Sequence, residues 1–196
     1  MGRYVEARCK LCRRAGEKLF LKGEKCQTAK CAFSRRSFAP GQHGKLPLRI
    51  SEYGIRLREK QKARRIYGLT ESQFENYFDK AVRTKGATGE KLLEFLERRL
   101  DNAVYRLGFT TSRQSARQLV RNGGILVNGR KVNIPAFQVK SGQVITVKPK
   151  LVAQVKAAQE KFPDRVQPTW LVVTGEAEGK IVTIPKREEI ETIVAE

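Results

Sequence analysis

All four cysteines of this chain lie within its first 31 residues, as C-x2-C (Cys9 and Cys12) and then, after thirteen residues, C-x4-C (Cys26 and Cys31). Two short pairs of thiolates at this spacing are typical of a tetrahedral metal site closed by four protein ligands. Such a site leaves no position open for a substrate, so the pattern favours a structural metal over a catalytic one. We expect Zn²⁺, with an iron–sulfur cluster as the alternative, because the spacing does not separate the two.

The segment around these cysteines, residues 1–49, reads as a basic arm with few apolar residues and a loop signal at Pro40-Gly41-Gln42-His43-Gly44. A segment of this composition buries too little apolar surface to stay ordered alone. Metal binding would supply roughly 10 kcal/mol or more of folding free energy. The sequence therefore predicts an N-terminal arm that a metal ion staples.

Positive charge is concentrated in two separate stretches of the chain. Residues 1–65 hold 19 basic and 5 acidic residues (+14) and residues 98–147 hold 9 and 1 (+8), out of a total of +20. Residues 66–97 and 148–196 carry −2 and 0. A charge of this size predicts a polyanionic partner, either nucleic acid or an anionic membrane.

The membrane alternative is disfavoured by the distribution of apolar residues. No apolar run approaches the roughly 20 residues that span a bilayer, and the N-terminus lacks an apolar signal region. We therefore expect a nucleic-acid partner, no membrane partner and a cytoplasmic location, where reduced cysteines tend to bind metals.

Apolar periodicity predicts an α+β chain. The ranges expected to be helical are 51–67 (N-cap Ser51), 70–82, 89–107 as one helix or a pair, 112–122 (opened by a capping box from Thr111 to Gln114) and 150–162. The expected strands are 125–127 and 130–132 around Asn128-Gly129, then 143–147, and 170–173 and 181–184 joined across Gly175–Gly179. Residues 98–147 thus form a compact α+β unit of helix, helix, hairpin and strand, and the neutral tail is expected to pack on the helices of 51–97.

Three arginines recur at four-residue spacing, Arg113, Arg117 and Arg121, and form one stripe on the helix 112–122. Guanidinium groups bind phosphate oxygens in a bidentate manner, and backbone N–H groups at the start of the helix could hold a phosphate. A merely solvated helix face is the alternative, but Asp101 is the one acidic residue within 98–147.

Signals for catalysis are weak. His43 is the single histidine and lies in the loop of the arm. Glu94 and Glu97 are expected to be exposed helix carboxylates, and the aromatic stripe Phe74, Tyr77 and Phe78 is expected to be core rather than a base-stacking platform. The sequence nominates no acid–base pair, and we expect the protein not to be an enzyme.

Several long stretches resemble the bacterial small-subunit ribosomal protein S4 family. They are GRYVEARCKLCRRAGEKLFLKGEKC, PGQHG, SEYGIRLREKQKARRIYGLTESQF and RLDNAVYRLGFTTSRQSARQLVRNGGILVNGRKVNIPAFQVKSGQVITV, the last of which is similar to the S4-type RNA-binding module. The resemblance implies a mainly helical domain with this α+β module inserted. Residues 1–49 would then be the arm, 50–97 the helical domain completed by 150–196, and 98–149 the module.

The resemblance also implies partners and a role. Such proteins bind the five-way junction of 16S ribosomal RNA early in small-subunit assembly. They lie near protein S5 and incoming messenger RNA, contribute to decoding accuracy, and in some bacteria repress their own operon. Members with the cysteine quartet bind zinc through it, which maps to Cys9, Cys12, Cys26 and Cys31. The chain departs from the family pattern at Asn122, Gly124, Gln143 and its ending IVAE.

Affinity is expected to come mainly from phosphate neutralisation and specificity from RNA shape. The residues predicted to bind RNA are Arg13, Arg14, Arg35, Arg36, Gln42, His43, Arg56, Arg58, Lys62, Arg64, Arg65, Arg106, Ser112, Arg113, Gln114, Arg117, Arg121 and Lys131. Two other functions remain open from the residues: an RNA-modifying enzyme such as a pseudouridine synthase, and a zinc-dependent DNA-binding regulator.

Overall fold

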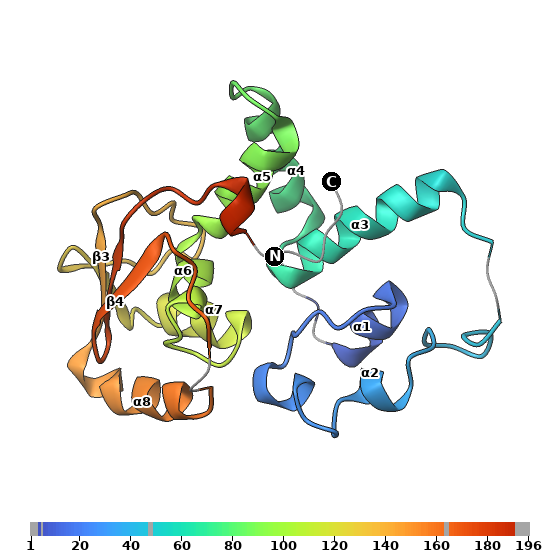
Figure 1. Ribbon diagram of the computed structural model, residues 1–196, viewed down its shortest axis with the longest axis horizontal. Helices are drawn as coiled ribbons and strands as arrows, with labels where there is room; N and C mark the ends of the chain where they lie inside the picture. Colours follow the sequence, from blue (N-terminus) through green and yellow to red (C-terminus); the bar gives the residue numbers. More distant parts are fainter. Residues whose placement is uncertain (1–3, 5, 47–48, 163–164, 191–196) are drawn as a thin grey trace. The chain divides into compact units, whose positions relative to one another are not determined.

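A computed structural model of the protein describes residues 4, 6–46, 49–162 and 165–190 (Figure 1). The α-helices in this part of the chain are α1 (Cys9–Ala15), α2 (Ala32–Arg35), α3 (Glu52–Ile66), α4 (Glu71–Val82), α5 (Thr88–Glu97), α6 (Leu100–Arg106), α7 (Arg113–Arg121) and α8 (Val152–Glu160). The 3-10 helices are η1 (Gly23–Cys26), η2 (Pro149–Leu151) and η3 (Arg187–Glu189). The strands are β1 (Ile125–Val127), β2 (Arg130–Lys131), β3 (Val144–Val147), β4 (Leu171–Gly175) and β5 (Glu178–Ile181).

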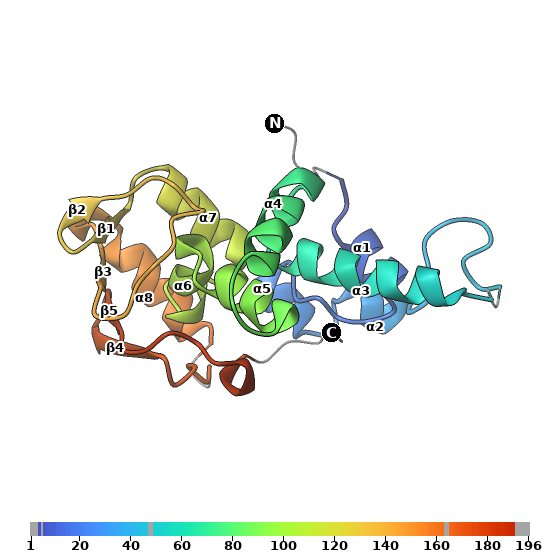
Figure 2. The ribbon, with the colours of Figure 1, turned by 90° about the horizontal axis from the view of Figure 1, so that it is seen from above.

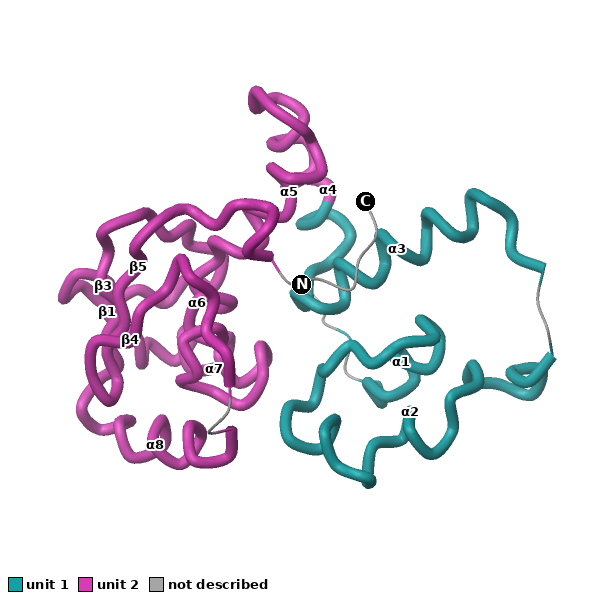
Figure 3. The backbone as a smooth tube through the Cα atoms, in the orientation of Figure 1, with its two compact units in different colours: residues 1–74, 193–196 teal, residues 75–192 magenta. Residues whose placement is uncertain are grey.

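The chain divides into two compact units (Figure 3). Unit 1 comprises residues 1–74 and 193–196, and unit 2 comprises residues 75–192. The C-terminal IVAE, 193–196, lies outside the described residues. No helix among the described residues combines the length and apolar content that a membrane span requires.

Helix α3 of unit 1 begins and ends where the sequence predicts. The Ser51 hydroxyl accepts a hydrogen bond from the Gly54 N–H at 3.2 Å, which caps the first turn. The helix ends before Gly68, whose φ of 64° lies in the left-handed region that favours glycine. Apolar residues of this unit that are buried include Leu19, Ala63, Ile66, Tyr67 and Leu69.

The aromatic stripe of α4 is only partly core. Phe74 is buried, but Phe78 is 46% exposed, so the expectation of a core position is wrong for Phe78. Tyr77 is half-buried, and its hydroxyl accepts a hydrogen bond from Arg99 at 2.9 Å. One face of α4 therefore holds both an apolar side chain and a polar contact.

The predicted helical stretch 89–107 is a pair of helices, α5 and α6, separated at Arg98 and Arg99. The break has a tertiary cause. Arg99 adopts extended backbone angles and forms an isolated antiparallel bridge with Gln138, and the Leu100 N–H donates to the Phe137 carbonyl at 2.9 Å. Hydrogen bonds to residues 137 and 138, far along the sequence, thus replace backbone hydrogen bonds that a continuous helix would have made at Arg99 and Leu100.

Unit 2 contains a five-stranded antiparallel sheet in the order β2-β1-β3-β5-β4. The predicted hairpin is confirmed: Asn128 (φ 48°) and Gly129 (φ 77°) both take positive φ, as a tight type I′ turn requires. Helices α6, α7 and α8 lie on one side of the sheet (Figures 1 and 2). Apolar side chains from these helices and the sheet share one core that includes Trp170, the single tryptophan, at 1% exposure.

The strands of the tail join this sheet, whereas the prediction that 150–196 completes the helical domain of 50–97 has the tail packing on those helices. Strand β5 pairs with β3, so the β4–β5 hairpin extends the sheet of the module, while η3 lies against α5. The predicted turn residue Gly179 belongs to β5 instead. A Cβ at this position would lie 2.5 Å from Leu107 Cδ2, so the glycine serves the close approach of α6 to the sheet.

Candidate nucleic-acid interface

Helix α7 carries the arginine stripe and is fixed at its start by Ser112. The Ser112 hydroxyl accepts a hydrogen bond from the Ser115 N–H at 3.2 Å. Ser112, rather than the predicted Thr111, is therefore the N-cap, and the helix begins at Arg113. Ser112 itself is buried and Gln114 is exposed, so the two residues predicted to bind phosphate at this end differ in access to a partner.

The three arginines of the stripe are not equivalent. Arg113 is half-buried and donates from Nε to Asn102 Oδ1 at 2.8 Å. Arg117, with 15% of its side chain exposed, has Nη1 3.7 Å from Asp101 Oδ2. Arg121 is exposed in the last turn. Two arginines are thus anchored by α6, and the third faces outward.

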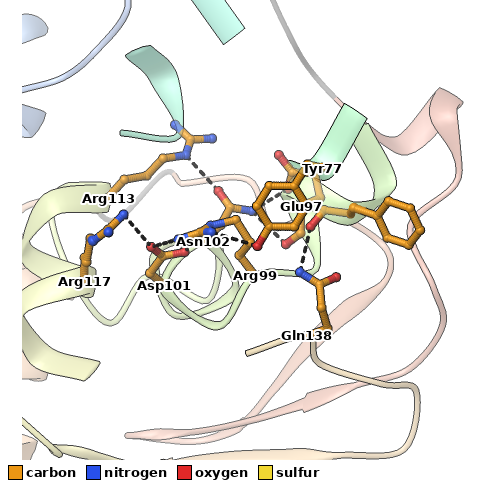
Figure 4. Close-up of polar contacts among 9 residues, drawn as sticks. Tyr77, Glu97, Arg99, Asp101, Asn102, Arg113, Arg117 and Gln138 are labelled. Carbon is orange, nitrogen blue, oxygen red and sulfur yellow. Dashed lines mark hydrogen bonds and ion pairs between the residues drawn. The ribbon is translucent and has the colours of Figure 1, made fainter. Parts of the chain in front are cut away.

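The anchors of the stripe belong to a buried polar network (Figure 4). Arg99 donates to Asp101 through two parallel hydrogen bonds, of 3.0 Å and 2.7 Å, and reaches the Tyr77 hydroxyl with its other Nη. Burial alone would lower the pKa of Arg99, but the Asp101 carboxylate raises it overall, so the buried guanidinium stays charged. Asp101 is in this way shared between Arg99 and Arg117.

Glu97 is the second buried carboxylate, and the expectation that it is exposed is wrong. It is 1% exposed and accepts hydrogen bonds from Asn102 Nδ2 at 2.8 Å and from Arg106 at 3.0 and 3.1 Å. The break after α5 turns Glu97 against α6, where Arg106 compensates its charge. Arg106, predicted to bind RNA, is therefore also a structural partner of Glu97.

Sequence reasoning missed this network because its members are separated by a helix break. Glu97, Arg99 and Asn102 were not predicted as site residues, and Glu97 reads as one more carboxylate of a surface helix. One signal did exist: Asp101 is a single acidic residue among nine basic ones within 98–147, which is unusual unless it has a fixed partner.

The hairpin adds two exposed cations to unit 2. Arg130 and Lys131 form β2, and both are exposed. Asn128 holds the hairpin to the sheet, since its side-chain oxygen accepts from the Val144 N–H at 2.8 Å. The predicted site residue Lys131 therefore lies on an edge strand of the sheet rather than in the turn.

In unit 1 the predicted basic residues of α3 fall into two groups. Arg56 is exposed, with an ion pair to Glu52 at 2.5 Å, and Arg58 is half-buried. Lys62 is 6% exposed and lies between Glu59 (2.6 Å) and Glu17 (3.0 Å), so its ammonium is used within the protein.

The last turn of α3 is similarly engaged. Arg64 lies 3.0 Å from Glu71, and Arg65 is half-buried, where burial and the neighbouring Arg64 lower its pKa. Of the α3 residues predicted to bind RNA, Arg56 is therefore the exposed one.

The arm contributes one structural arginine and several exposed polar residues. Arg13 donates to the carbonyls of Phe38 (2.9 Å) and Ala39 (3.3 Å) and stacks over the Phe38 ring. It thereby ties α1 to the loop that precedes α3. The other predicted residues of the arm are exposed: Arg14, Arg35, Arg36, Gln42 and His43.

The four cysteines are free thiols that lie on three short elements. Cys9 and Cys12 are one turn apart on α1, Cys26 ends η1, and Cys31 immediately precedes α2. Cys12, Cys26 and Cys31 are buried. In the part of the chain that the structure describes, no group of three or more His, Cys, Asp or Glu residues is arranged to hold a metal ion.

The thiols nevertheless act on one another electrostatically. Burial raises the pKa of Cys12, the Leu19 N–H opposes this shift, and the charges of Cys26, Cys9 and Cys31 raise it further. Burial alone raises the pKa of Cys31, but hydrogen bonds from Ser34 and Phe33 lower it overall. Helix α1, which carries Cys9 and Cys12, lies against α2, which Cys31 immediately precedes.

Two family descriptions match the sequence in succession. "Ribosomal protein S4/S9 N-terminal domain" matches residues 3–97, and "S4 domain" matches residues 98–145. The second range contains α6, α7, the β1–β2 hairpin and the start of β3, which carry the arginine stripe and most of its buried anchors.

Similar proteins match over nearly the whole chain and share one name, "Small ribosomal subunit protein uS4". The relative from Desulforamulus reducens is 55% identical over 199 residues and covers 100% of this chain and 96% of its own length. The relative from Solidesulfovibrio magneticus is 53% identical (97% and 93%), and that from Acetivibrio thermocellus is 54% identical (100% and 96%).

Proposed function

The chain belongs to the uS4 family of small ribosomal subunit proteins, and we propose on that basis that it binds 16S ribosomal RNA through the face of α7 and β2. It is a structural constituent of the small subunit, located in the cytoplasm, and not an enzyme. The RNA-modifying alternative is therefore set aside in favour of a binding function.

The main observation behind the proposal is that other residues of the module hold the arginine stripe in place. Arg113 and Arg117 are held by Asn102 and Asp101, so their guanidiniums keep fixed positions on a helix whose N-terminus is itself capped. A rigid array of cations loses little conformational entropy when it meets a rigid polyanion. Folded RNA presents phosphates in such an array, and protein contacts to it are dominated by phosphate and shape.

The finer role follows the resemblance described above. We propose that the RNA partner is the five-way junction region of 16S RNA and that binding occurs early in assembly. Protein S5 and incoming messenger RNA are the proposed neighbours, with an effect on decoding accuracy. The exposed arginines of unit 1, Arg14, Arg35, Arg36 and Arg56, support a second contact with the same RNA.

For the arm we propose a structural zinc site formed by Cys9, Cys12, Cys26 and Cys31. A set of four thiolates suits Zn²⁺ or an iron–sulfur cluster, and α1, which carries two of the cysteines, lies against α2, which Cys31 precedes. A bound metal would keep the thiols deprotonated and join α1, η1 and α2 into one body. Metal analysis of the native protein together with its absorption spectrum tests this assignment. The absorption bands of an iron–sulfur cluster would assign that cluster to the site instead of zinc.

Competition between nucleic acids tests the proposed function. A labelled 16S junction RNA is bound to the full-length protein, and unlabelled junction RNA or duplex DNA of equal phosphate content is added. We expect the RNA to displace the label at much lower concentration than the DNA. Stronger competition by duplex DNA would instead support the zinc-dependent DNA-binding regulator.

A further inference from the structure

Helix α7 ends in a Schellman motif built around Gly123. The Gly124 N–H donates to the Leu119 carbonyl at 3.0 Å, and the Gly123 N–H donates to the Val120 carbonyl at 2.8 Å. Gly123 has a φ of 68°, the left-handed conformation that this motif requires of the residue after the C-cap. Two of the last helical carbonyls are therefore satisfied by backbone N–H groups rather than by a side chain.

The side chain of Lys131 lies across this glycine. Lys131 stands opposite Leu126 in the antiparallel β1–β2 pair, which fixes its backbone. A Cβ at Gly123 would overlap Cε of Lys131 and would lie 3.1 Å from its Nζ. Because Gly123 has no side chain, the stem of Lys131 can reach the C-terminal end of α7.

The ammonium of Lys131 is exposed at this end of α7. Among the residues that the structure describes, it has neither a hydrogen-bond partner nor an ion-pair partner. Arg121, in the last turn of the helix, is also exposed and likewise has no such partner in the described part of the chain. The partial negative charge of a helix C-terminus favours cations there. Two cations that the protein itself does not pair thus lie at the end of α7.

We propose that the Lys131 ammonium contacts a backbone phosphate of the RNA at the C-terminal end of α7, and that Gly123 is the positioning residue that lets it lie there. An ammonium binds phosphate as a point charge, so its contribution depends on where its stem holds it. A stem that already lies across Gly123 loses less conformational entropy when the RNA binds. The proposal rests on the proposed function, since it assigns a further residue to binding of the same RNA.

The test is a double-mutant cycle on the full-length protein, measured as affinity for the 16S junction RNA over a range of KCl concentrations. Its members are the wild type, Gly123→Ala, Lys131→Met, which keeps an unbranched stem but removes the charge, and the double variant. We expect Lys131→Met to weaken binding and to make the slope of log K against log[KCl] shallower by roughly 0.7 to 0.9, as for one phosphate. Gly123→Ala should weaken binding severalfold in the wild-type background and have little further effect in the Lys131→Met background.

Backbone strain in Gly123→Ala is controlled by Gly108→Ala in the same unit. Gly108 follows α6 with a φ of 80°, and a Cβ there would meet nothing within 4 Å. Both substitutions force alanine into the left-handed region, so both variants should lose similar stability when unfolding is followed by Trp170 fluorescence. Gly108→Ala should nevertheless keep the affinity of the wild type for the RNA.

Two results would overturn the positioning role of Gly123. One is an equal loss of affinity from Gly123→Ala in the wild-type and Lys131→Met backgrounds, and the other is an equal loss in Gly108→Ala. A steep wild-type slope that Lys131→Met leaves intact overturns this inference alone. A flat wild-type slope overturns the proposed function together with it.

A less strained substitution covers the case in which Gly123→Ala does not fold. Asparagine tolerates the left-handed region better than alanine does, but it still places a Cβ where the Lys131 stem lies. We expect Gly123→Asn to bind the RNA severalfold more weakly than wild type and to lose this effect in the Lys131→Met background. An affinity of Gly123→Asn equal to that of wild type would overturn the positioning role.

Discussion

Arg99 and Asp101 lie two residues apart and form a two-pronged ion pair inside unit 2, with Nε 3.0 Å from Oδ1 and Nη2 2.7 Å from Oδ2. The two residues are 1% and 4% exposed. Asp101 also faces Arg117 of the stripe. The pair therefore joins the break between α5 and α6 to the helix that carries the proposed RNA contacts.

Replacing Asp101 by Asn should lower the free energy of unfolding of unit 2 by about 3 kcal/mol or more, because the buried charge of Arg99 loses its partner. Denaturant unfolding followed by Trp170 fluorescence measures the loss. The matched control is Glu176→Gln, which removes one partner of the Lys156–Glu176 pair of unit 2, with side chains 48% and 68% exposed, and should cost less than about 1 kcal/mol. A loss of less than 1 kcal/mol in Asp101→Asn would show that the buried pair adds little to stability.

Replacing Ser112 by Ala should destabilise unit 2 by about 1 kcal/mol, because the Ser115 N–H loses its capping acceptor. The same Trp170 assay applies. Thr111→Ala is the control, since this neighbouring hydroxyl residue does not cap α7, and a change of a few tenths of a kcal/mol is expected. If the two variants are equally destabilised, the cap is not specific to Ser112.

Unit 1 should become less stable in acid, because the carboxylate of Glu71 becomes protonated. A hydrogen bond from Lys60, at 2.6 Å, and the positive charge of Arg64 hold the pKa of Glu71 below its ordinary value, although partial burial opposes them. A carboxyl group with a depressed pKa stabilises the folded state above its unfolded pKa, and this stabilisation is lost as the pH falls below the ordinary pKa of a glutamate and through the lower folded value.

Hydrogen exchange of the amides of α3, corrected for the intrinsic effect of pH, measures this loss. Protection should fall more steeply in wild type than in Glu71→Gln, which lacks the titrating group and should already be less protected at neutral pH. Parallel curves for the two proteins would assign the acid sensitivity to other carboxylates.

Replacing Cys9 and Cys12 together by Ser should disorder the arm and leave the module folded, because the proposed metal site would act within unit 1. Hydrogen exchange should show rapid exchange over residues 6–40 and unchanged protection over 98–147. Serine keeps the size and polarity of the side chain but is not a zinc ligand at neutral pH, so treatment of wild type with a chelator should give the same pattern. Loss of protection in the module would show that the arm supports more of the fold than proposed.

Helix and hairpin positions could be predicted because they depend on local residues. Ser51 caps α3, and Asn128-Gly129 turns the hairpin, as their chemistry alone requires. The break before Leu100 could not be predicted, since its cause is pairing of Arg99 with the distant Gln138. Gly179 was misread for the same reason: the side chain that requires a glycine there, Leu107, is far away in the sequence.

The candidate site was predictable in part. Four-residue spacing identified Arg113, Arg117 and Arg121 as one face of a helix, because helical geometry is local. The inward anchoring of the first two could not be inferred, because Asn102 and Asp101 reach them from α6 through tertiary packing. Lys62 shows the converse, a predicted surface cation that Glu17 and Glu59 hold inside unit 1.

The salt dependence of RNA binding tests the central claim most directly. The affinity of the protein for the 16S junction RNA is measured between low and high KCl. If at least about six phosphates are neutralised, log K should fall linearly with log[KCl] with a slope of about −4 or steeper. An affinity that does not change with salt would contradict the claim that this protein binds RNA by neutralising its phosphates.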